Sequence, residues 1–202
     1  MKIALIGATG NAGSRILAEL SRRGHHVTAI ARHPEKLPKL SGITGLKADA
    51  GDVAGLAAAI KSHDAVISAV HFTASDPNKL IAAVHQDQVP RYLVVGGAGS
   101  LEVAPGVKLI DTPAFPAAYK AEAAAGGAFL DLLRQEPVLD WTFLSPSAML
   151  VPGERTGKFR LGGDQLLTSD KGSSISLEDY AIAMADEIEK PKHSRQRFTV
   201  GY

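Results

Sequence analysis

The segment with the clearest chemistry in this 202-residue chain is Gly7–Gly13, which reads G-A-T-G-N-A-G. Glycines at its three turn positions let the backbone curl tightly and approach a diphosphate without an obstructing Cβ. The segment follows a short apolar run, Ile3–Ile6, and opens an amphipathic stretch, Asn11–Arg23. A strand, a glycine turn and a helix with free N–H groups at its start form a dinucleotide-phosphate site. The alternative is a glycine-rich surface turn without a ligand.

A second signal lies at the end of the next predicted strand. An NAD-preferring site usually carries an acidic residue about twenty positions after the glycines, where it accepts hydrogen bonds from the ribose 2′-hydroxyl. Here that region reads Ile30-Ala31-Arg32-His33 and contains no carboxylate. A guanidinium binds the 2′-phosphate of NADP through charge-assisted hydrogen bonds. The sequence therefore predicts that NADP(H) is preferred over NAD(H), with an ordinary exposed arginine as the alternative.

Two further places suit the same ligand. Asp49 follows the third predicted strand and could accept a hydrogen bond from the adenine amino group, or simply cap the next turn. Ser68-Ala69-Val70 offers small residues where a strand would pass the adenine ribose, although small residues also pack well in a buried strand.

The elements that must position these residues alternate between strand and helix. Strands are predicted at Ile3–Ile6, Val27–Ala31, Leu46–Ala48, Ala65–Val70, Tyr92–Val95, Trp141–Leu144 and Phe198–Val200. Helices are predicted at Asn11–Arg23, Asp52–Ile60, Asp76 to about Gln88, Pro116 or Ala117 to about Gln135 (loosened by Gly126-Gly127), and Ser176–Ile188.

This alternation implies parallel βαβ units. The expected fold is a three-layer, doubly wound parallel sheet, or Rossmann fold. It forms one α/β domain over residues 1–202 with a small C-terminal extension on the substrate side. The Gly- and Pro-rich segments Gly96–Pro113 and Ser145–Ser174 follow strands, so they should border the ligand crevice.

Composition excludes several other classes of protein. The chain has 22 Lys and Arg against 21 Asp and Glu, so no strong field favours nucleic acid or an anionic membrane. It has no cysteine, which excludes disulfides, thiolate metal sites and cysteine nucleophiles. The seven histidines show no metal-binding spacing, so no metal is expected. No apolar run is long enough for a signal peptide or membrane span, and we expect a cytoplasmic protein.

Several blocks resemble the atypical short-chain dehydrogenase/reductases, closest to the NmrA-like and biliverdin reductase B (flavin reductase)-like proteins. These blocks are Gly7–Gly13, Ala31-Arg32, Val94–Ser100, Asp140–Ser147 and Ile175–Ala181. The resemblance implies that NADP lies across the strand tips, with Gly96 and the Pro146 turn beside the nicotinamide. The expected cofactor-binding residues are Gly7, Thr9, Gly10, Asn11, Ala12, Gly13, Arg32, Asp49, Ala50, Ala69, Val70, Gly96 and Pro146.

The chain departs from this superfamily at its usual proton donor, a tyrosine with a lysine four residues later. None of the four tyrosines has a lysine at that spacing, and Tyr119 is instead followed directly by Lys120. Tyr119 stays a candidate proton donor, and Ser100 and Ser145 are candidate polar groups near the nicotinamide. His71 could line the cleft.

Three functions fit these observations. The first is an NADPH-dependent oxidoreductase that transfers hydride to a small planar acceptor such as a flavin or quinone, which needs no dedicated tyrosine–lysine pair. The second is a non-catalytic NADP(H)-sensing protein of NmrA-like type that binds a protein partner. The third, a nucleotide-sugar epimerase or dehydratase, is disfavoured because those enzymes keep the pair and carry a substantial substrate domain.

Overall fold

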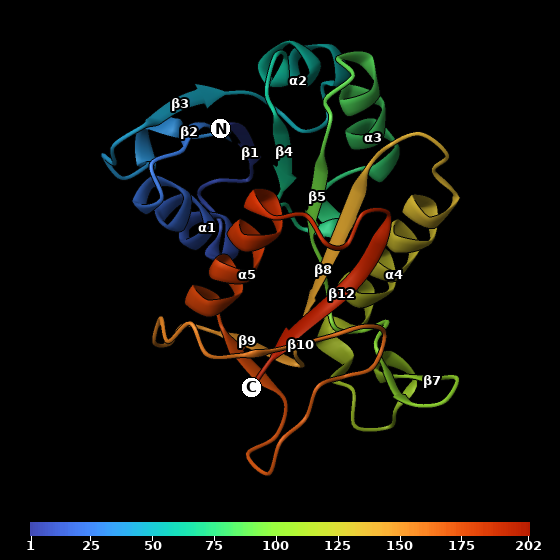
Figure 1. Ribbon diagram of the computed structural model, residues 1–202. Coiled ribbons are helices and arrows are strands. Elements are labelled where there is room, and N and C mark those ends of the chain that lie inside the picture. Colours follow the sequence, from blue (N-terminus) through green and yellow to red (C-terminus); the bar gives the residue numbers. More distant parts are fainter.

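The computed structural model describes all 202 residues, arranged around one eight-stranded sheet (Figure 1). The strand order is β10-β12-β8-β5-β4-β1-β2-β3, and every pair is parallel except β10–β12. The strands are β1 (Lys2–Ile6), β2 (His26–Ala31), β3 (Ile43–Lys47), β4 (Ala65–Ser68), β5 (Tyr92–Val95), β8 (Trp141–Pro146), β10 (Arg160–Gly162) and β12 (Gln196–Gly201). The predicted Rossmann-type sheet is confirmed, with one antiparallel strand at its edge.

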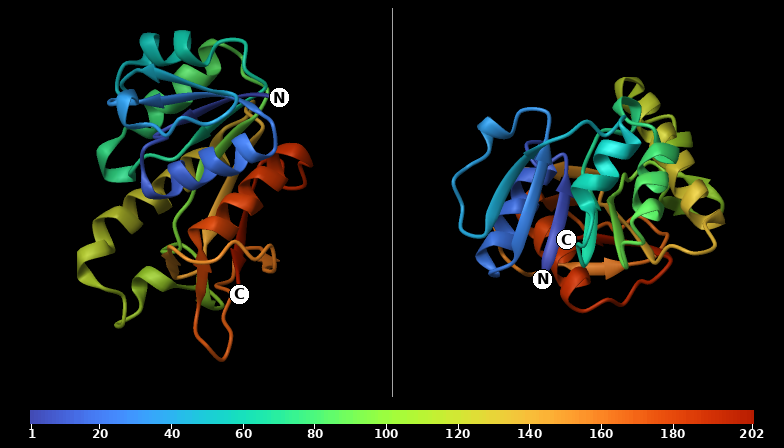
Figure 2. Two further views of the ribbon diagram at one scale, coloured as in Figure 1. Left: turned by 90° about the vertical axis from the view of Figure 1, so that its left-hand side faces the viewer. Right: turned by 90° about the horizontal axis from the view of Figure 1, so that it is seen from above.

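Helices cover both faces of the sheet and make the outer two layers (Figure 2). Helices α1 (Asn11–Arg22) and α5 (Leu177–Glu189) pack together on one face. Helices α2 (Val53–Ile60), α3 (Pro77–Gln86) and α4 (Lys120–Gln135) cover the other. The central strands are therefore buried on both sides, which explains the apolar runs Ile3–Ile6 in β1 and Ala65–Ile67 in β4.

The order in which strands are added to the sheet changes direction at β1, between β3 and β4. The first three strands step outward in the order β1, β2, β3, and the chain then returns to place β4 on the other side of β1. In an open α/β sheet, ligands bind beyond the carboxyl ends of the strands at this switch point. The glycine turn that follows β1 lies there.

Two predicted elements differ from the structure by more than two residues at one end. Strand β3 spans Ile43–Lys47 rather than 46–48, because an edge strand with four exposed residues has no continuous apolar run to mark it. Helix α4 is unbroken at Gly126 and follows a separate 3₁₀ turn, Ala117–Tyr119. A Cβ on Gly126 would lie 2.7 Å from Cε2 of Phe72, so this glycine makes room for a neighbouring ring instead of loosening the helix.

The Gly- and Pro-rich segments form short pairs of strands beyond the sheet. Strands β6 (Glu102–Ala104) and β7 (Val107–Lys108) make one pair, and β9 (Met149–Val151) and β11 (Ser174–Ser176) make the other. No helix combines the length and apolar character needed to cross a bilayer.

Candidate functional site

A cavity of about 300 Å³ opens at the carboxyl ends of β1, β2 and β4. Eight of the residues expected to bind the cofactor line it together: Gly7, Thr9, Gly10, Arg32, Asp49, Ala50, Ala69 and Val70. The remaining lining residues are Ile6, Ile30, Ala31, Ala48, His71 and Ala74. The wall is therefore mostly apolar and backbone, with few charged groups.

The glycine turn is held by close backbone packing. Gly7 has φ of +82°, a conformation that favours glycine, and a Cβ there would lie 2.5 Å from the carbonyl oxygen of Ala69. A Cβ on Gly13 would overlap the carbonyl oxygen of Gly7. These two glycines let β1, β4 and the start of α1 meet at one point, which sets the floor of the cavity.

Helix α1 begins at this point without a side-chain cap. Its N-cap residue is Gly10, and the first hydrogen bond to it runs from the Ser14 N–H to the Gly10 carbonyl oxygen at 2.9 Å. By contrast, side chains of Asp52, Asp76 and Ser176 cap α2, α3 and α5. An uncapped helix start that faces a cavity attracts an anion, because its N–H groups and the positive end of its dipole are free.

Arg32 is the one arginine of the chain whose guanidinium has no hydrogen-bond or ion-pair partner. The other nine each donate to a carboxylate, a hydroxyl or a carbonyl oxygen. Arg32 is exposed, follows β2 and lines the cavity. It is therefore free to bind an anionic ligand there.

Asp49 caps a turn through its side chain and also lines the cavity. One carboxylate oxygen, Oδ1, accepts a hydrogen bond from the Gly51 N–H at 2.8 Å. Its capping role is therefore present in the structure, and an adenine contact would use the other oxygen.

The wall opposite Arg32 follows β4 and includes η2, the 3₁₀ turn Phe72–Ala74. Glu122 of α4 accepts hydrogen bonds from the N–H groups of Phe72 (2.7 Å) and Thr73 (3.0 Å) and from the Thr73 hydroxyl (2.6 Å). Partial burial works to raise the pKa of Glu122, but these hydrogen bonds outweigh it and hold the pKa below its ordinary value. Helix α4 therefore fixes this wall through one ionised carboxylate.

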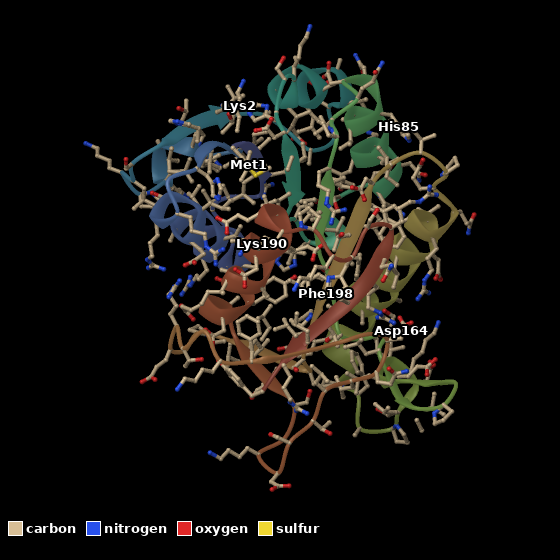
Figure 3. The ribbon with its side chains drawn as sticks, viewed as in Figure 1. Met1, Lys2, His85, Asp164, Lys190 and Phe198 are labelled. Carbon is tan, nitrogen blue, oxygen red and sulfur yellow. The ribbon has the colours of Figure 1, made fainter.

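The three candidate catalytic hydroxyls lie in different surroundings. Tyr119 is 66% exposed and lies in the turn before α4. Ser145 is fully buried, and both its hydroxyl and that of Ser100 accept hydrogen bonds from Arg197, at 3.4 and 3.3 Å. Arg197 in turn pairs with Asp164, labelled in Figure 3. The two serines are thus engaged by the fold, and only Tyr119 presents a free hydroxyl.

The structure does not bring all predicted cofactor residues into the cavity. Asn11, Ala12 and Gly13 form the first turn of α1 behind it, and Gly96 and Pro146 lie farther along the strand tips. A Cβ on Gly96 would lie 2.6 Å from the Leu144 carbonyl oxygen, so a glycine is needed there for packing against β8. The roles of Gly96 and Pro146 beside a nicotinamide stay predictions.

Sequence reasoning missed two groups near the site. One is Glu122, whose partners lie about fifty residues earlier in the chain. The other is Tyr180 of α5, whose buried hydroxyl donates to the Leu144 carbonyl oxygen at 2.6 Å and accepts from the Gly96 N–H at 3.3 Å. Burial raises the pKa of Tyr180, so this hydroxyl stays neutral and ties the ends of β5 and β8 together. No local pattern marks either residue.

Residues 7–191 match the model of a family described as NAD(P)H-binding. The chain belongs to this NAD(P)H-binding family. The match includes the glycine turn, Arg32, the wall after β4 and the whole of α4 and α5, so it spans the cavity described above.

Individual relatives support the same assignment. The Bacillus subtilis (strain 168) protein YwnB is 43% identical over 99% of this chain and 98% of its own length. A solved structure of a proposed epimerase from Bacteroides thetaiotaomicron is 43% identical with a TM-score of 0.95, over 100% of this chain and 96% of that one. A proposed NADH-flavin reductase from Streptococcus pneumoniae is 40% identical with a TM-score of 0.85, over 100% and 99%. The resemblance drawn from the sequence motifs is confirmed.

Proposed function

We propose that this member of the NAD(P)H-binding family is an NADPH-dependent oxidoreductase that reduces a small planar acceptor of the flavin or quinone type. The observation that carries the proposal is the pairing of an uncapped helix start with the unpartnered Arg32 in one cavity. The first suits a diphosphate and the second suits the additional 2′-phosphate of NADP.

The residues present fit that cofactor by charge and by space. Small residues, Ala50 and Ala69 among them, leave room for the adenosine, and a carboxylate that would repel the 2′-phosphate is absent from the position after β2. When bound, NADPH would supply a hydride, which carries two electrons and one proton to the acceptor, and a second proton from solvent would complete a hydroquinone. The cavity residues bind and orient the cofactor.

The acceptor class is inferred from what the chain lacks. Without a tyrosine and lysine at the usual spacing, the protein is poorly equipped to protonate a simple carbonyl substrate. A flavin or quinone ring delocalises incoming charge, so it needs less help from a dedicated acid. The similarity to a proposed NADH-flavin reductase supports this acceptor class. The missing pair argues against an epimerase function for this chain, although the similar Bacteroides protein is described as a proposed epimerase.

The test is NADPH consumption by the purified protein, followed by absorbance with FMN, riboflavin and several small quinones, with NADH in parallel. We expect turnover with at least one planar acceptor and faster consumption of NADPH than of NADH. Tight NADPH binding without turnover on any acceptor would contradict the oxidoreductase proposal. That result would favour the alternative, a non-catalytic NADP(H) sensor that binds a protein partner.

A further inference from the structure

His71 lines the cavity, yet the proposed function has given it no role. It is the third residue after β4, following Ala69 and Val70, and its side chain is 85% exposed. The ring nitrogen Nδ1 lies 3.2 Å from Oε1 of Glu122. The other ring nitrogen, Nε2, has no partner within the protein and is available to a ligand.

Glu122 holds this ring as part of a rigid wall. The same carboxylate that meets His71 also accepts the hydrogen bonds from Phe72 and Thr73 described above. Phe72 is anchored in turn, because its ring stacks on Phe143 with centroids 6.1 Å apart and meets Phe129 edge-on. An exposed imidazole that is fixed on one nitrogen by a carboxylate is pre-organised to bind with the other.

The order of the strands places His71 relative to the cofactor. Strands β2, β1 and β4 are neighbours in that order, and successive strands lie about 4.8 Å apart. Arg32 follows β2, the glycine turn follows β1, and His71 follows β4. If Arg32 takes the 2′-phosphate and the glycine turn takes the diphosphate, the next group along this row lies toward the nicotinamide half.

Chain length sets the reach of the ring. The Ala69 carbonyl oxygen packs directly against Gly7 of the glycine turn. His71 lies two residues farther on, which spans at most about 7 Å of extended backbone. Its side chain is therefore within reach of an anion held at the start of α1.

We propose that the His71 imidazole contacts the diphosphate of the cofactor on the side of the nicotinamide half, and that Glu122 is the positioning residue for this contact. This inference rests on the proposed function. An imidazole N–H donates a hydrogen bond to a phosphate oxygen, and the negative charge of the phosphate strengthens that bond. The charged groups around the ring are Glu122 on α4, in contact, and Arg32 and Asp49 across the cavity.

Calorimetric titration with two ligands separates this contact from the rest of the site. NADPH carries the whole diphosphate, whereas 2′,5′-ADP ends at the adenosine-side phosphate. We expect His71→Gln to weaken NADPH binding about tenfold. Binding of 2′,5′-ADP should stay within about twofold of the wild type, since that ligand lacks the contacted group.

Three further variants sharpen the experiment. His85 of α3 (Figure 3) is also paired with a glutamate, its Nε2 lying 3.0 Å from Oε2 of Glu136, but it does not line the cavity. His85→Gln should leave both affinities unchanged. Glu122→Gln should weaken NADPH binding, and its effect should be smaller in the His71→Gln background than in the wild type, because the part of its effect that acts through the ring is already lost there.

Three results would overturn the proposal. The first is unchanged NADPH affinity of His71→Gln. The second is an equal loss for NADPH and 2′,5′-ADP, which would show a general distortion of the wall. The third is additive losses in the double variant. If the wild type binds neither ligand, the proposed function itself fails, and the inference fails with it.

Discussion

Two cavities of similar volume border helix α1, and they differ in how their charges are used. The cavity that follows β1, β2 and β4 measures about 300 Å³. It is lined by Arg32, which has no partner, and by His71, of which only Nδ1 has a partner. The second measures about 310 Å³ and lies against the middle of α1, α5 and the loop after β9. It is lined by Ser14, Arg15, Ala18, Glu19, Arg22, Arg155 and Glu178, so it has more arginines than the first.

Every charge in the second cavity already has a partner. Glu19 is 2% exposed and pairs with Arg22, Arg23 and Arg155 at 2.6–2.9 Å. Arg15 pairs with Glu178 at 3.2 Å. A ligand there would have to displace these pairs, whereas a ligand in the first cavity meets groups that are free. Unpaired charge, rather than the number of charges, therefore indicates which cavity binds a ligand.

The largest expected effect that tests this difference between the cavities comes from removing the charge of Glu19 in the second cavity. Glu19→Gln would leave three arginines without their shared carboxylate, one of them joining the loop after β9 to α1. We expect the free energy of unfolding to fall by about 3 kcal/mol, because the three arginines lose a buried carboxylate that they share, although Arg23 keeps Asp186 and Glu189 as partners. Urea unfolding measures the loss, and NADPH affinity should stay within about twofold. A large loss of NADPH affinity would show that the second cavity also serves the cofactor.

The acid sensitivity of the same network is a second prediction. The hydrogen bond from Arg155, opposed by burial and assisted by Arg23, lowers the pKa of Glu19 from 4.5 to about 2. A carboxyl group with a lowered pKa in the folded state stabilises the fold above its unfolded pKa and loses that contribution as the pH falls toward the folded value. Between pH 5 and pH 2 this contribution of about 3 kcal/mol should disappear. The stability gap between wild type and Glu19→Gln should therefore shrink over that range, and a constant gap would contradict the assignment.

A smaller effect is expected from Gly13→Ala, in the first turn of α1 behind the first cavity. The new Cβ would overlap the Gly7 carbonyl oxygen, and the backbone can relieve this only by shifting the glycine turn. We expect a loss of about 2 kcal/mol in unfolding free energy, together with weaker NADPH binding. Gly163→Ala is the matched control, since a Cβ at Gly163 meets nothing within 4 Å. Equal behaviour of the two variants would argue against close packing at Gly13.

The smallest effect is expected at Tyr119. Its exposed hydroxyl has no lysine four residues later to assist proton transfer, and a planar acceptor needs little acid assistance. Tyr119→Phe should reduce kcat with the best acceptor less than about tenfold. A loss of more than about a hundredfold would instead identify Tyr119 as the proton donor. The unpartnered hydroxyl of Tyr119 would then have a role in catalysis, as the unpartnered Arg32 has in the proposed cofactor binding.

The sequence predicted the site residues that come from neighbouring segments of the chain, and it missed the contacts between residues far apart in the chain. The glycine turn and Arg32 lie within one βαβ unit, so their spacing along the chain already places them at adjacent strand ends. Glu122 meets His71 across 51 residues, and Arg197 captures the hydroxyls of Ser100 and Ser145 across 97 and 52 residues. These pairings follow from how α4 and β12 pack on the sheet, which no local pattern specifies.

Arg32→Glu tests the central claim most directly, with NADPH and NADH titrated against the wild type and the variant. The account predicts that the variant loses about a hundredfold in affinity for NADPH, because a free guanidinium is replaced by a carboxylate that repels the 2′-phosphate. Its affinity for NADH should change only a few-fold. Lys36→Glu, the same charge change at an exposed residue outside the cavity, is the control. Equal losses for the two cofactors in Arg32→Glu would contradict the assignment of Arg32 to the 2′-phosphate.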